Sequence, residues 1–400
     1  MISQNPSKHV LFLARWYPDR YDPMPGLFIQ RHAEAVALYH KVSLIYVHAK
    51  FPEEPNQNTE FELVTTNKVT TLRIYYGSKA FAKVPLLSPV LKVAYYIVYH
   101  YKGFRLISEK SGKPDIIHVN VLTRLGVIAL ILKAMHGIRY IITEHWSRYL
   151  PVTGTFQGFW RKLITRLVVQ KASAVTTVTA NLAAAMKSHG LNNQHYTVVA
   201  NVADTQNFIP SPNIPDLPVT LLHISCFEDR SKNISGLLRV VKRLSDSRND
   251  FRIKMVGDGQ DFERMTSYSD SLGIDKTIIE FTGLLEGAAL ISAFHQSHFL
   301  VMFSNYENMP VVINEAFCCG LPVVATKVGG IPEVVTPERG ELVNAGDEDA
   351  LTDTLNYMID NYMQFERNTI HRFALENFSY GSIGEKFSGI YHDALSPVER

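Results

Sequence analysis

The first half of the chain alternates short apolar runs with longer segments of helical periodicity. Segments 27–39 and 123–135 repeat their apolar residues with the period of an amphipathic helix. The apolar runs are rich in β-branched residues, as buried strands are, and lie at 10–13, 42–47, 115–120, 140–145, 174–179 and 196–201. Near-continuous apolar strands that alternate with helices predict a parallel sheet covered on both faces.

A proline-rich segment interrupts this pattern and predicts a domain boundary. Residues 207–218 contain four prolines, which is typical of a stiff linker. The alternation then restarts, with apolar runs at 219–225, 251–257, 278–283, 298–304, 321–326 and 340–346. We therefore predict two Rossmann-like, doubly wound α/β domains at 1–206 and 219–379. Ligands of such sheets bind at the carboxyl ends of the strands, so we expect a site in the cleft between the domains.

Length and composition agree with a soluble protein of about two domains, because 400 residues exceed one typical core. The longest apolar stretches, such as 125–135, fall short of the ~20 residues that span a bilayer. The apolar run Val10–Ala14 is too short for a secretory signal. The three cysteines, Cys226, Cys318 and Cys319, have no zinc-binding spacing. These features favour a cytoplasmic protein.

The charge is divided unevenly along the chain. Residues 1–205 carry 24 Lys and Arg against 11 Asp and Glu, whereas the rest of the chain is acidic. A basic half indicates an anionic partner, either nucleic acid or an anionic membrane surface, unless the division is accidental. Residues 78–113 carry seven basic residues, one acid and several aromatics. This stretch is either a helical insertion packed on its own domain or a membrane-facing surface.

Residues 304–330, SNYENMPVVINEAFCCGLPVVATKVGG, contain the most specific pattern. A strand ends at Ser304, and Pro310 suits the first turn of a helix that extends to about Cys319. The first turn of that helix is suited to an anion such as a diphosphate. Glu307 in the loop and Glu315 on the helix flank it, and their carboxylates can accept hydrogen bonds from sugar hydroxyls.

These motifs together resemble a family 4 glycosyltransferase with the GT-B architecture, over most of the chain. The family's Glu, seven residues, Glu pattern stands here as Glu307 and Glu315, followed by GLPVVATKVGGIPE. Further matches are WYPDRYDPMPGLFIQRHAEAVA, PDIIHVN, ITEHWSRY, VVANVADTQNF, VGDG, IEFTG and the closing ENFSYGSIGEKFSGIYHDAL. The resemblance implies that the last helix, about 380–395, packs back onto the first domain, which binds the acceptor, while the second binds a nucleotide-diphosphate sugar.

The resemblance also implies roles for single residues. Glu307 contacts the donor hexose and Glu315 the ribose, and Lys232 holds the diphosphate. Phe227 stands where the family's partner arginine is commonest, so Arg230 is the candidate to replace that arginine. His145 is the candidate for contacting the sugar, and Gly26 for close backbone approach. The other implied donor-binding residues are Asn308, Met309, Pro310, Val311, Gly257, Gly283 and Leu284.

The residues contain no cluster with metal-ligand spacing and no DxD stretch, so we expect neither a metal nor a cofactor. The resemblance implies a hexosyltransferase that retains the anomeric configuration, and we expect a lipid-linked or polysaccharide acceptor of the bacterial cell surface. No nucleic-acid partner is then expected. The alternatives are a nucleotide-sugar epimerase or phosphorylase on the same scaffold, and a non-catalytic relative that binds a glycan. His118 is expected to be structural because it lies within a strand.

Overall fold

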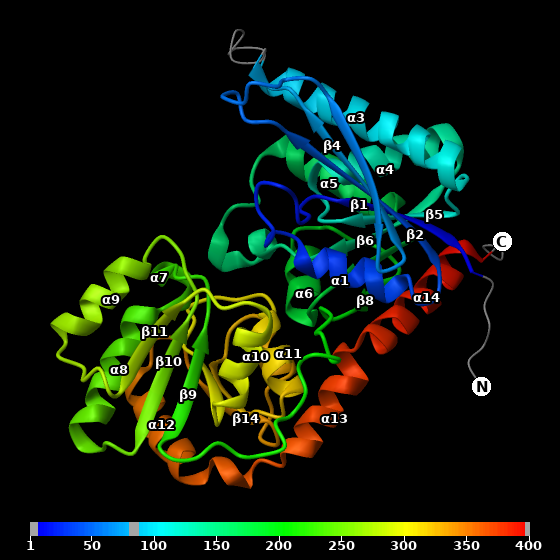
Figure 1. The fold of residues 1–400 in the computed structure, drawn as a ribbon. Helices are drawn as coiled ribbons and strands as arrows, with labels where there is room; N and C mark the ends of the chain where they lie inside the picture. Colours follow the sequence, from blue (N-terminus) through cyan, green and yellow to red (C-terminus); the bar gives the residue numbers. More distant parts are fainter. Residues whose placement is uncertain (1–6, 80–87, 397–400) are drawn as a thin grey trace. The chain divides into compact units, whose positions relative to one another are not determined.

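The computed structural model describes residues 7–79 and 88–396, which form two compact units (Figure 1). Unit 1 comprises Met1–Val178, Leu182–Val202 and Tyr380–Arg400, and unit 2 comprises Thr179–Asn181 and Ala203–Ser379. Lys83 of the basic stretch 78–113 lies outside the described residues, as does the rest of 80–87. Among the described helices, none is long and apolar enough to cross a membrane.

Unit 1 contains an eight-stranded sheet with the order β3-β4-β2-β1-β5-β6-β7-β8. Its strands are β1 (His9–Ala14), β2 (Lys41–Ala49), β3 (Glu60–Thr66), β4 (Val69–Tyr76), β5 (Ile116–Asn120), β6 (Arg139–Glu144), β7 (Ala174–Thr177) and β8 (Tyr196–Val198). All neighbours are parallel except β3 and β4, which form a hairpin at one edge. The predicted parallel sheet is confirmed, and the edge hairpin is an addition that the apolar pattern did not predict.

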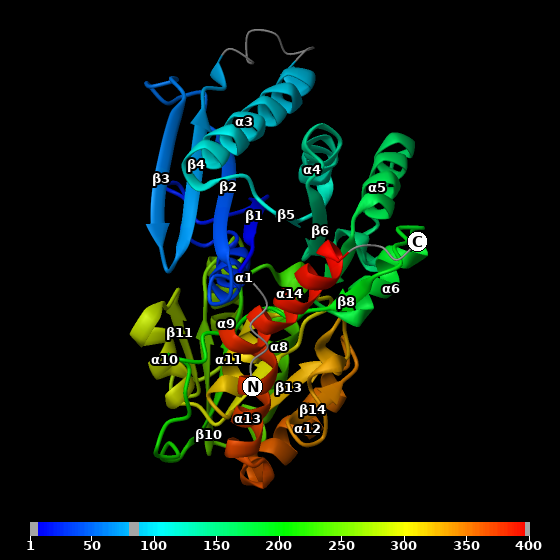
Figure 2. The ribbon, with the colours of Figure 1, turned by 90° about the vertical axis from the view of Figure 1, so that its right-hand side faces the viewer.

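Helices cover both faces of this sheet (Figures 1 and 2). α1 (Leu27–Val36) and α14 (Tyr380–Leu395) pack side by side and share a core with Phe12 and Leu44. Ile45, the next residue of β2, instead contacts Gly103 of α3 (Ser88–Ser111). Because successive strand residues face opposite sides, α3 lies on the other face. The other helices of this part of the chain, among the residues that the structure describes, are α4 (Thr123–His136), α5 (Phe159–Lys171), α6 (Ala180–Ser188), η1 (Ser147–Tyr149) and η2 (Pro151–Thr153).

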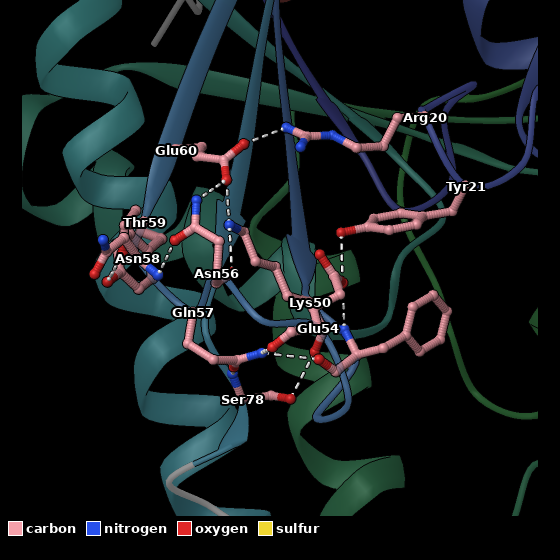
Figure 3. Close-up of polar contacts among 12 residues, drawn as sticks. Arg20, Tyr21, Lys50, Glu54, Asn56, Gln57, Asn58, Thr59, Glu60 and Ser78 are labelled. Carbon is pink, nitrogen blue, oxygen red and sulfur yellow. Dashed lines mark hydrogen bonds and ion pairs between the residues drawn. The ribbon is translucent and has the colours of Figure 1, made fainter.

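A polar cluster holds the loop between β2 and β3 at the carboxyl end of β2 (Figure 3). Lys50 is buried, and its Nζ donates to the backbone oxygen of Asn56 at 2.9 Å and to the Glu60 carboxylate. Arg20 pairs with the same carboxylate at 2.7 Å, and the Tyr21 hydroxyl donates to Glu54 at 2.8 Å. A buried ammonium must have such partners, so this cluster fixes the loop against the segment that follows β1.

Unit 2 contains a six-stranded, fully parallel sheet with the order β11-β10-β9-β12-β13-β14. Its strands are β9 (Val219–Ile224), β10 (Phe251–Val256), β11 (Ile279–Gly283), β12 (Phe299–Met302), β13 (Val323–Thr326) and β14 (Gly340–Val343). Its helices are α7 (Asp229–Lys232), α8 (Ile234–Ser247), α9 (Phe262–Ser271), α10 (Gly287–His295), α11 (Val311–Cys318), α12 (Glu348–Asn361), α13 (Arg367–Phe378), η3 (Ile331–Glu333) and η4 (Tyr362–Gln364). In sequence order this is the 3-2-1-4-5-6 arrangement of a doubly wound sheet.

Candidate functional site

The strand order of unit 2 reverses between β9 and β12, and two loops meet outside the carboxyl ends of these strands. The loop after β9 leads into α7, which ends at Lys232, and the loop after β12 carries Glu307. Asn305 joins the loops, because its backbone N–H donates to Ser231 and its side chain to the backbone oxygen of Arg230. This is the place where doubly wound sheets bind their ligands.

Lys232 and Glu307 form an ion pair at this point. Nζ of Lys232 lies 2.5 Å from Oε1 of Glu307, and the side chains are 15% and 9% exposed. The Ser304 hydroxyl donates to the same oxygen at 2.9 Å, which fixes the carboxylate from a second side. Burial opposes the charge on Lys232, but the adjacent carboxylate outweighs it and raises the pKa of Lys232. Lys232 is therefore positively charged at neutral pH, and Glu307 holds its ammonium group in place.

The Gly329–Gly330 pair lies directly beneath the Glu307 loop. A Cβ atom at Gly329 would lie 2.1 Å from the backbone oxygen of Glu307, and Gly329 has a φ of +57°. The backbone N–H of Gly330 donates to the backbone oxygen of Asn308 at 2.7 Å. Only glycine allows this approach at this dihedral angle. The double glycine after β13 therefore positions the carboxylate of Glu307.

Replacing Gly329 by alanine should displace this loop and lower activity, because the new Cβ would meet backbone atoms that cannot rotate away. Gly273→Ala is the matched control, since Gly273 has a φ of +67° but a Cβ atom added there would meet nothing within 4 Å. Both variants bear the left-handed backbone cost of about 1 kcal/mol. We expect only Gly329→Ala to lose activity, by about 10-fold or more. Equal activity of the two variants in a rate assay would contradict this role.

α11 follows the same loop and carries the second glutamate. Pro310 has extended dihedral angles and precedes the helix, which begins at Val311, one residue later than the sequence predicted. Met309 is buried, and Asn308 and Val311 are half-buried. Glu315 is buried on the helix. The first-turn N–H groups of a helix lack intrahelical partners and favour anions. The Glu307 loop and the start of α11 therefore present a carboxylate and N–H donors, and the end of α7 adds the ammonium of Lys232.

The loops after β10 and β11 border this site. A Cβ at Gly257 would lie 1.9 Å from the backbone oxygen of Ser225, so the β10 turn packs directly on the loop after β9. Gly257 also donates to the backbone oxygen of Gly283, which ends β11, and the next residue, Leu284, is exposed. The three residues that the sequence suggested here, Gly257, Gly283 and Leu284, therefore share one edge of the sheet.

The sequence departs from the family pattern at Phe227 and Arg230. These two residues lie in different environments. Phe227 is fully buried, and its ring packs on Phe262 at a centroid distance of 4.9 Å. Arg230 is exposed on α7, two residues before Lys232. An aromatic residue at 227 thus belongs to the core, whereas the side chain of Arg230 is available at the surface.

In unit 1, His145 follows β6 and lies beside α1. Its ring centroid is 4.5 Å from that of Phe28 and 5.2 Å from that of His32. Nδ1 is 3.3 Å from Oδ1 of Asn201. Burial, reinforced by the neighbouring histidines, holds the pKa of His145 well below 6.5. His145 is therefore neutral at physiological pH, with one ring nitrogen able to donate and the other able to accept.

Gly26 lies at the start of α1, two residues before Phe28. A Cβ at Gly26 would lie 2.3 Å from the backbone oxygen of Trp16, and its φ is +79°. Gly26 therefore allows the start of α1 to lie close to the segment of the same chain that follows β1. His118 is buried and contacts the Tyr391 hydroxyl and Thr143, which agrees with the expected structural role.

Glu144, which the sequence patterns did not single out, organises the loops at the carboxyl end of the unit 1 sheet. Its buried carboxylate accepts hydrogen bonds from the backbone N–H groups of Leu122, His145 and Trp146, at 2.9–3.0 Å. Burial raises its pKa to about 7 against the opposing effect of these bonds. Val121, beside Leu122, has a φ of +68°, which is strained for a β-branched residue. In the sequence, the available signal for Glu144 was its position as an acid at the end of an apolar strand.

Among the described residues, no group of three or more His, Cys, Asp or Glu side chains is arranged to hold a metal ion. The positive charge placed at the unit 2 site is that of Lys232, with Arg230 nearby in the chain.

Comparison with known proteins identifies the family. Residues 204–373 match the family model of glycosyl transferases group 1, and residues 33–202 match that of the glycosyl transferase 4-like domain. The N-acetyl-alpha-D-glucosaminyl L-malate synthase of Bacillus anthracis is 26% identical over 329 residues, which cover 75% of this chain and 82% of that protein.

Two further proteins show similarity in sequence or fold. The lipopolysaccharide 1,6-galactosyltransferase of Escherichia coli K12 is 24% identical over 218 residues, covering 53% of this chain and 57% of that one. The crystal structure of Anabaena HepE in complex with UDP-glucose superposes with a TM-score of 0.68 at 17% identity, covering 96% and 99% of the two chains. The two family models together span nearly the whole chain, which therefore belongs to the group 1, family 4-like glycosyltransferases of the GT-B fold.

Proposed function

We propose that the protein transfers a hexosyl group from a nucleotide-diphosphate sugar to an acceptor glycan. The observation that carries this proposal is the Lys232–Glu307 pair at the strand-order reversal of unit 2, next to the start of α11. It combines a cation for the diphosphate, a carboxylate for sugar hydroxyls and helix N–H groups for phosphate oxygens. Each group is held on a strand end or helix, as transfer chemistry requires.

Lys232 is the group that we assign to the departing diphosphate. An ammonium has three N–H donors, so a phosphate oxygen can bind to Nζ together with, or in place of, Glu307. Arg230 is exposed and is the second cation within this segment. Its planar guanidinium group has paired N–H donors that suit the oxygens of a phosphate. Stabilising the charge that develops on the leaving group is the largest contribution such a site makes to rate. We therefore propose that transfer proceeds without a metal ion.

The two glutamates are assigned by resemblance to the family. Glu307 accepts hydrogen bonds from the transferred hexose, and buried Glu315 from the nucleoside ribose. Backbone of Asn308, Met309, Pro310 and Val311 lies between them, and the turns at Gly257, Gly283 and Leu284 border the nucleotide. His145 and Gly26 of unit 1 are assigned to the sugar side, where a neutral imidazole can both donate and accept.

We further propose that the anomeric configuration is retained by substitution on one face of the sugar, because no residue at the site is assigned as a nucleophile. The acceptor that we propose is a lipid-linked or polysaccharide glycan of the bacterial cell surface, modified on the cytoplasmic side. The lipopolysaccharide galactosyltransferase among the relatives supports this acceptor class. UDP-glucose is the first donor to test, because HepE was solved with it.

A screen of nucleotide sugars by thermal unfolding tests the proposal. The correct donor at about 100 times its Kd should raise the Tm by about 5–10 °C, because it binds the folded state alone. The same donor should be hydrolysed slowly without acceptor, in the presence or absence of EDTA, and NMR should show that the released sugar first appears with the donor's anomeric configuration. No stabilisation by any nucleotide sugar would contradict donor binding, and loss of turnover in EDTA would contradict metal independence.

We also propose that the basic stretch 78–113 meets an anionic membrane surface. α3 exposes Val90, Val93, Tyr95 and Val98 beside several lysines. An interfacial helix combines apolar side chains with cations in this way.

Flotation with vesicles tests this surface. The wild-type protein should float with anionic vesicles more than with neutral ones, and Lys92→Glu/Arg105→Glu should lose most of this preference, since each cation near the surface contributes about 1 kcal/mol. Arg372→Glu/Lys386→Glu makes the same charge reversal at exposed positions on α13 and α14 and should float normally. Equal flotation with both lipids would rule out the proposal.

A further inference from the structure

Four arginines line a pocket in unit 1. Arg15, Arg124, Arg148 and Arg161 surround a cavity of about 300 Å³, together with apolar and aromatic side chains that include Trp146 and Ile164. No aspartate or glutamate among the described residues lines it. A volume of this size accommodates a small ligand or the polar part of a larger one.

The pocket lies where a doubly wound sheet binds ligands. Arg15 directly follows β1, Arg124 is at the start of α4 after β5, and Arg148 follows β6. β1 and β5 are the neighbours between which the strand order of unit 1 reverses. Arginines from three separate carboxyl-end loops thus converge on the position that topology favours for a ligand.

The arginine charges are not balanced within the protein. None of the four forms an ion pair with a described residue, and the Nε atoms of Arg15 and Arg148 are buried without a hydrogen-bond partner among the described residues. The guanidinium of Arg148 lies 3.6 Å from the ring centroid of Trp146. Burial and the repulsion of Arg161 and Arg15 lower the pKa of Arg148, against the opposing effects of Tyr149 and Glu144.

Apart from Glu144, the sequence around Arg148 and Arg161 supplies no carboxylate to relieve this repulsion. Glu144 is the acid nearest to Arg148 and Arg161 along the chain, and its carboxylate is bound by three backbone N–H groups. No Asp or Glu occurs from His145 to Ala203. Like charges gathered in a partly buried pocket are unfavourable unless an anion binds there.

We propose that this pocket binds a phosphate ester or diphosphate group carried by the acceptor. Planar guanidinium groups bind phosphate through paired N–H donors, and several can share its oxygens. The inference rests on the proposed transfer function and narrows its acceptor to an anionic one. Beside the pocket, α5 exposes Phe159 and Trp160, which are 73% and 70% exposed. The phosphate group can therefore belong to a lipid-borne or to a soluble acceptor.

Titration of the full-length protein with inorganic diphosphate tests the pocket apart from the donor site. Arg124→Gln/Arg161→Gln removes its two exposed arginines, whereas Lys232→Gln removes the cation of the donor site. Each lost charge-assisted bond should weaken binding at the pocket by about 10-fold or more. The expected result is that Lys232→Gln keeps the binding of diphosphate at the pocket, whereas Arg124→Gln/Arg161→Gln loses it and keeps only the binding at the donor site. Arg372→Gln/Lys386→Gln should bind as the wild-type protein does.

The outcomes separate this inference from the proposed function. If Arg124→Gln/Arg161→Gln binds diphosphate like the wild-type protein, or if only Lys232→Gln loses it, the inference is wrong. The surface control Arg372→Gln/Lys386→Gln should hydrolyse the donor without acceptor at the wild-type rate, and absence of this hydrolysis in the wild-type protein would instead contradict the transfer function. Glycerol 3-phosphate, and phosphatidylcholine vesicles with or without phosphatidic acid, then distinguish a soluble from a lipid-borne phosphate.

Discussion

Replacing Glu307 by glutamine is expected to lower the rate of sugar transfer by at least about 100-fold. Glutamine keeps the shape and an oxygen for the Ser304 hydroxyl, but it removes the negative charge beside Lys232. In the proposed function, that charge faces the transferred sugar, where positive charge develops as the bond to the diphosphate breaks. Initial rates with a saturating donor and acceptor measure the effect.

The matched control for this change is Glu376→Gln, on an exposed position of α13. It removes the same charge far along the chain from the loop after β12 and should leave the rate unchanged. Circular dichroism and donor binding should show that Glu307→Gln remains folded. A Glu307→Gln protein that transfers sugar as fast as the control would refute the role assigned to this carboxylate.

The parallel strands could be predicted from the sequence because they are buried on both faces. β1 and β5 are buried at every position, so their apolar runs are nearly continuous. β3 was not predicted because it is an edge strand, and its residues are half-buried or exposed. The turn at Asn67 and Lys68, both with positive φ, was its available signal, since such two-residue turns join hairpin strands.

The sequence located the loops of the donor site but not their contacts. Motif spacing placed Lys232 and Glu307 at carboxyl ends of strands, whereas the ion pair between them depends on the adjacency of β9 and β12. Strand adjacency is set by packing over the whole sheet, and local pattern does not encode it. The same holds for Gly329, whose role appears only when the chain passes beneath the Glu307 loop.

The grouping of four arginines in one pocket could not be predicted from the sequence, for a different reason. Its four arginines are scattered from residue 15 to residue 161, and a charge count over the first 205 residues only registers a general excess of cations. The sharper signal was the absence of acids from His145 to Ala203. Which cations converge is decided by the ends of β1, β5 and β6 meeting at one edge.

Lys232→Met should separate the stabilising role of the ion pair from its role in transfer. Removing the ammonium leaves the carboxylate of Glu307, which is 9% exposed, without its cation, at a cost of about 3 kcal/mol in the free energy of unfolding. Because the pKa of Lys232 is raised, this stabilisation is fully present below pH 10.5 and is lost only as the pH rises further. Urea unfolding at neutral pH measures the loss.

The double variant Lys232→Met/Glu307→Gln decides between the two roles. With both charges gone, no buried charge is left unpaired, so most of the lost stability should return. Donor affinity and transfer rate should stay at least about 100-fold below those of the wild-type protein, because the ammonium assigned to the departing diphosphate is then missing. Recovery of activity together with stability would mean that the pair acts only to hold the two loops together. A double variant as unstable as Lys232→Met would mean that the carboxylate needs no cation at all.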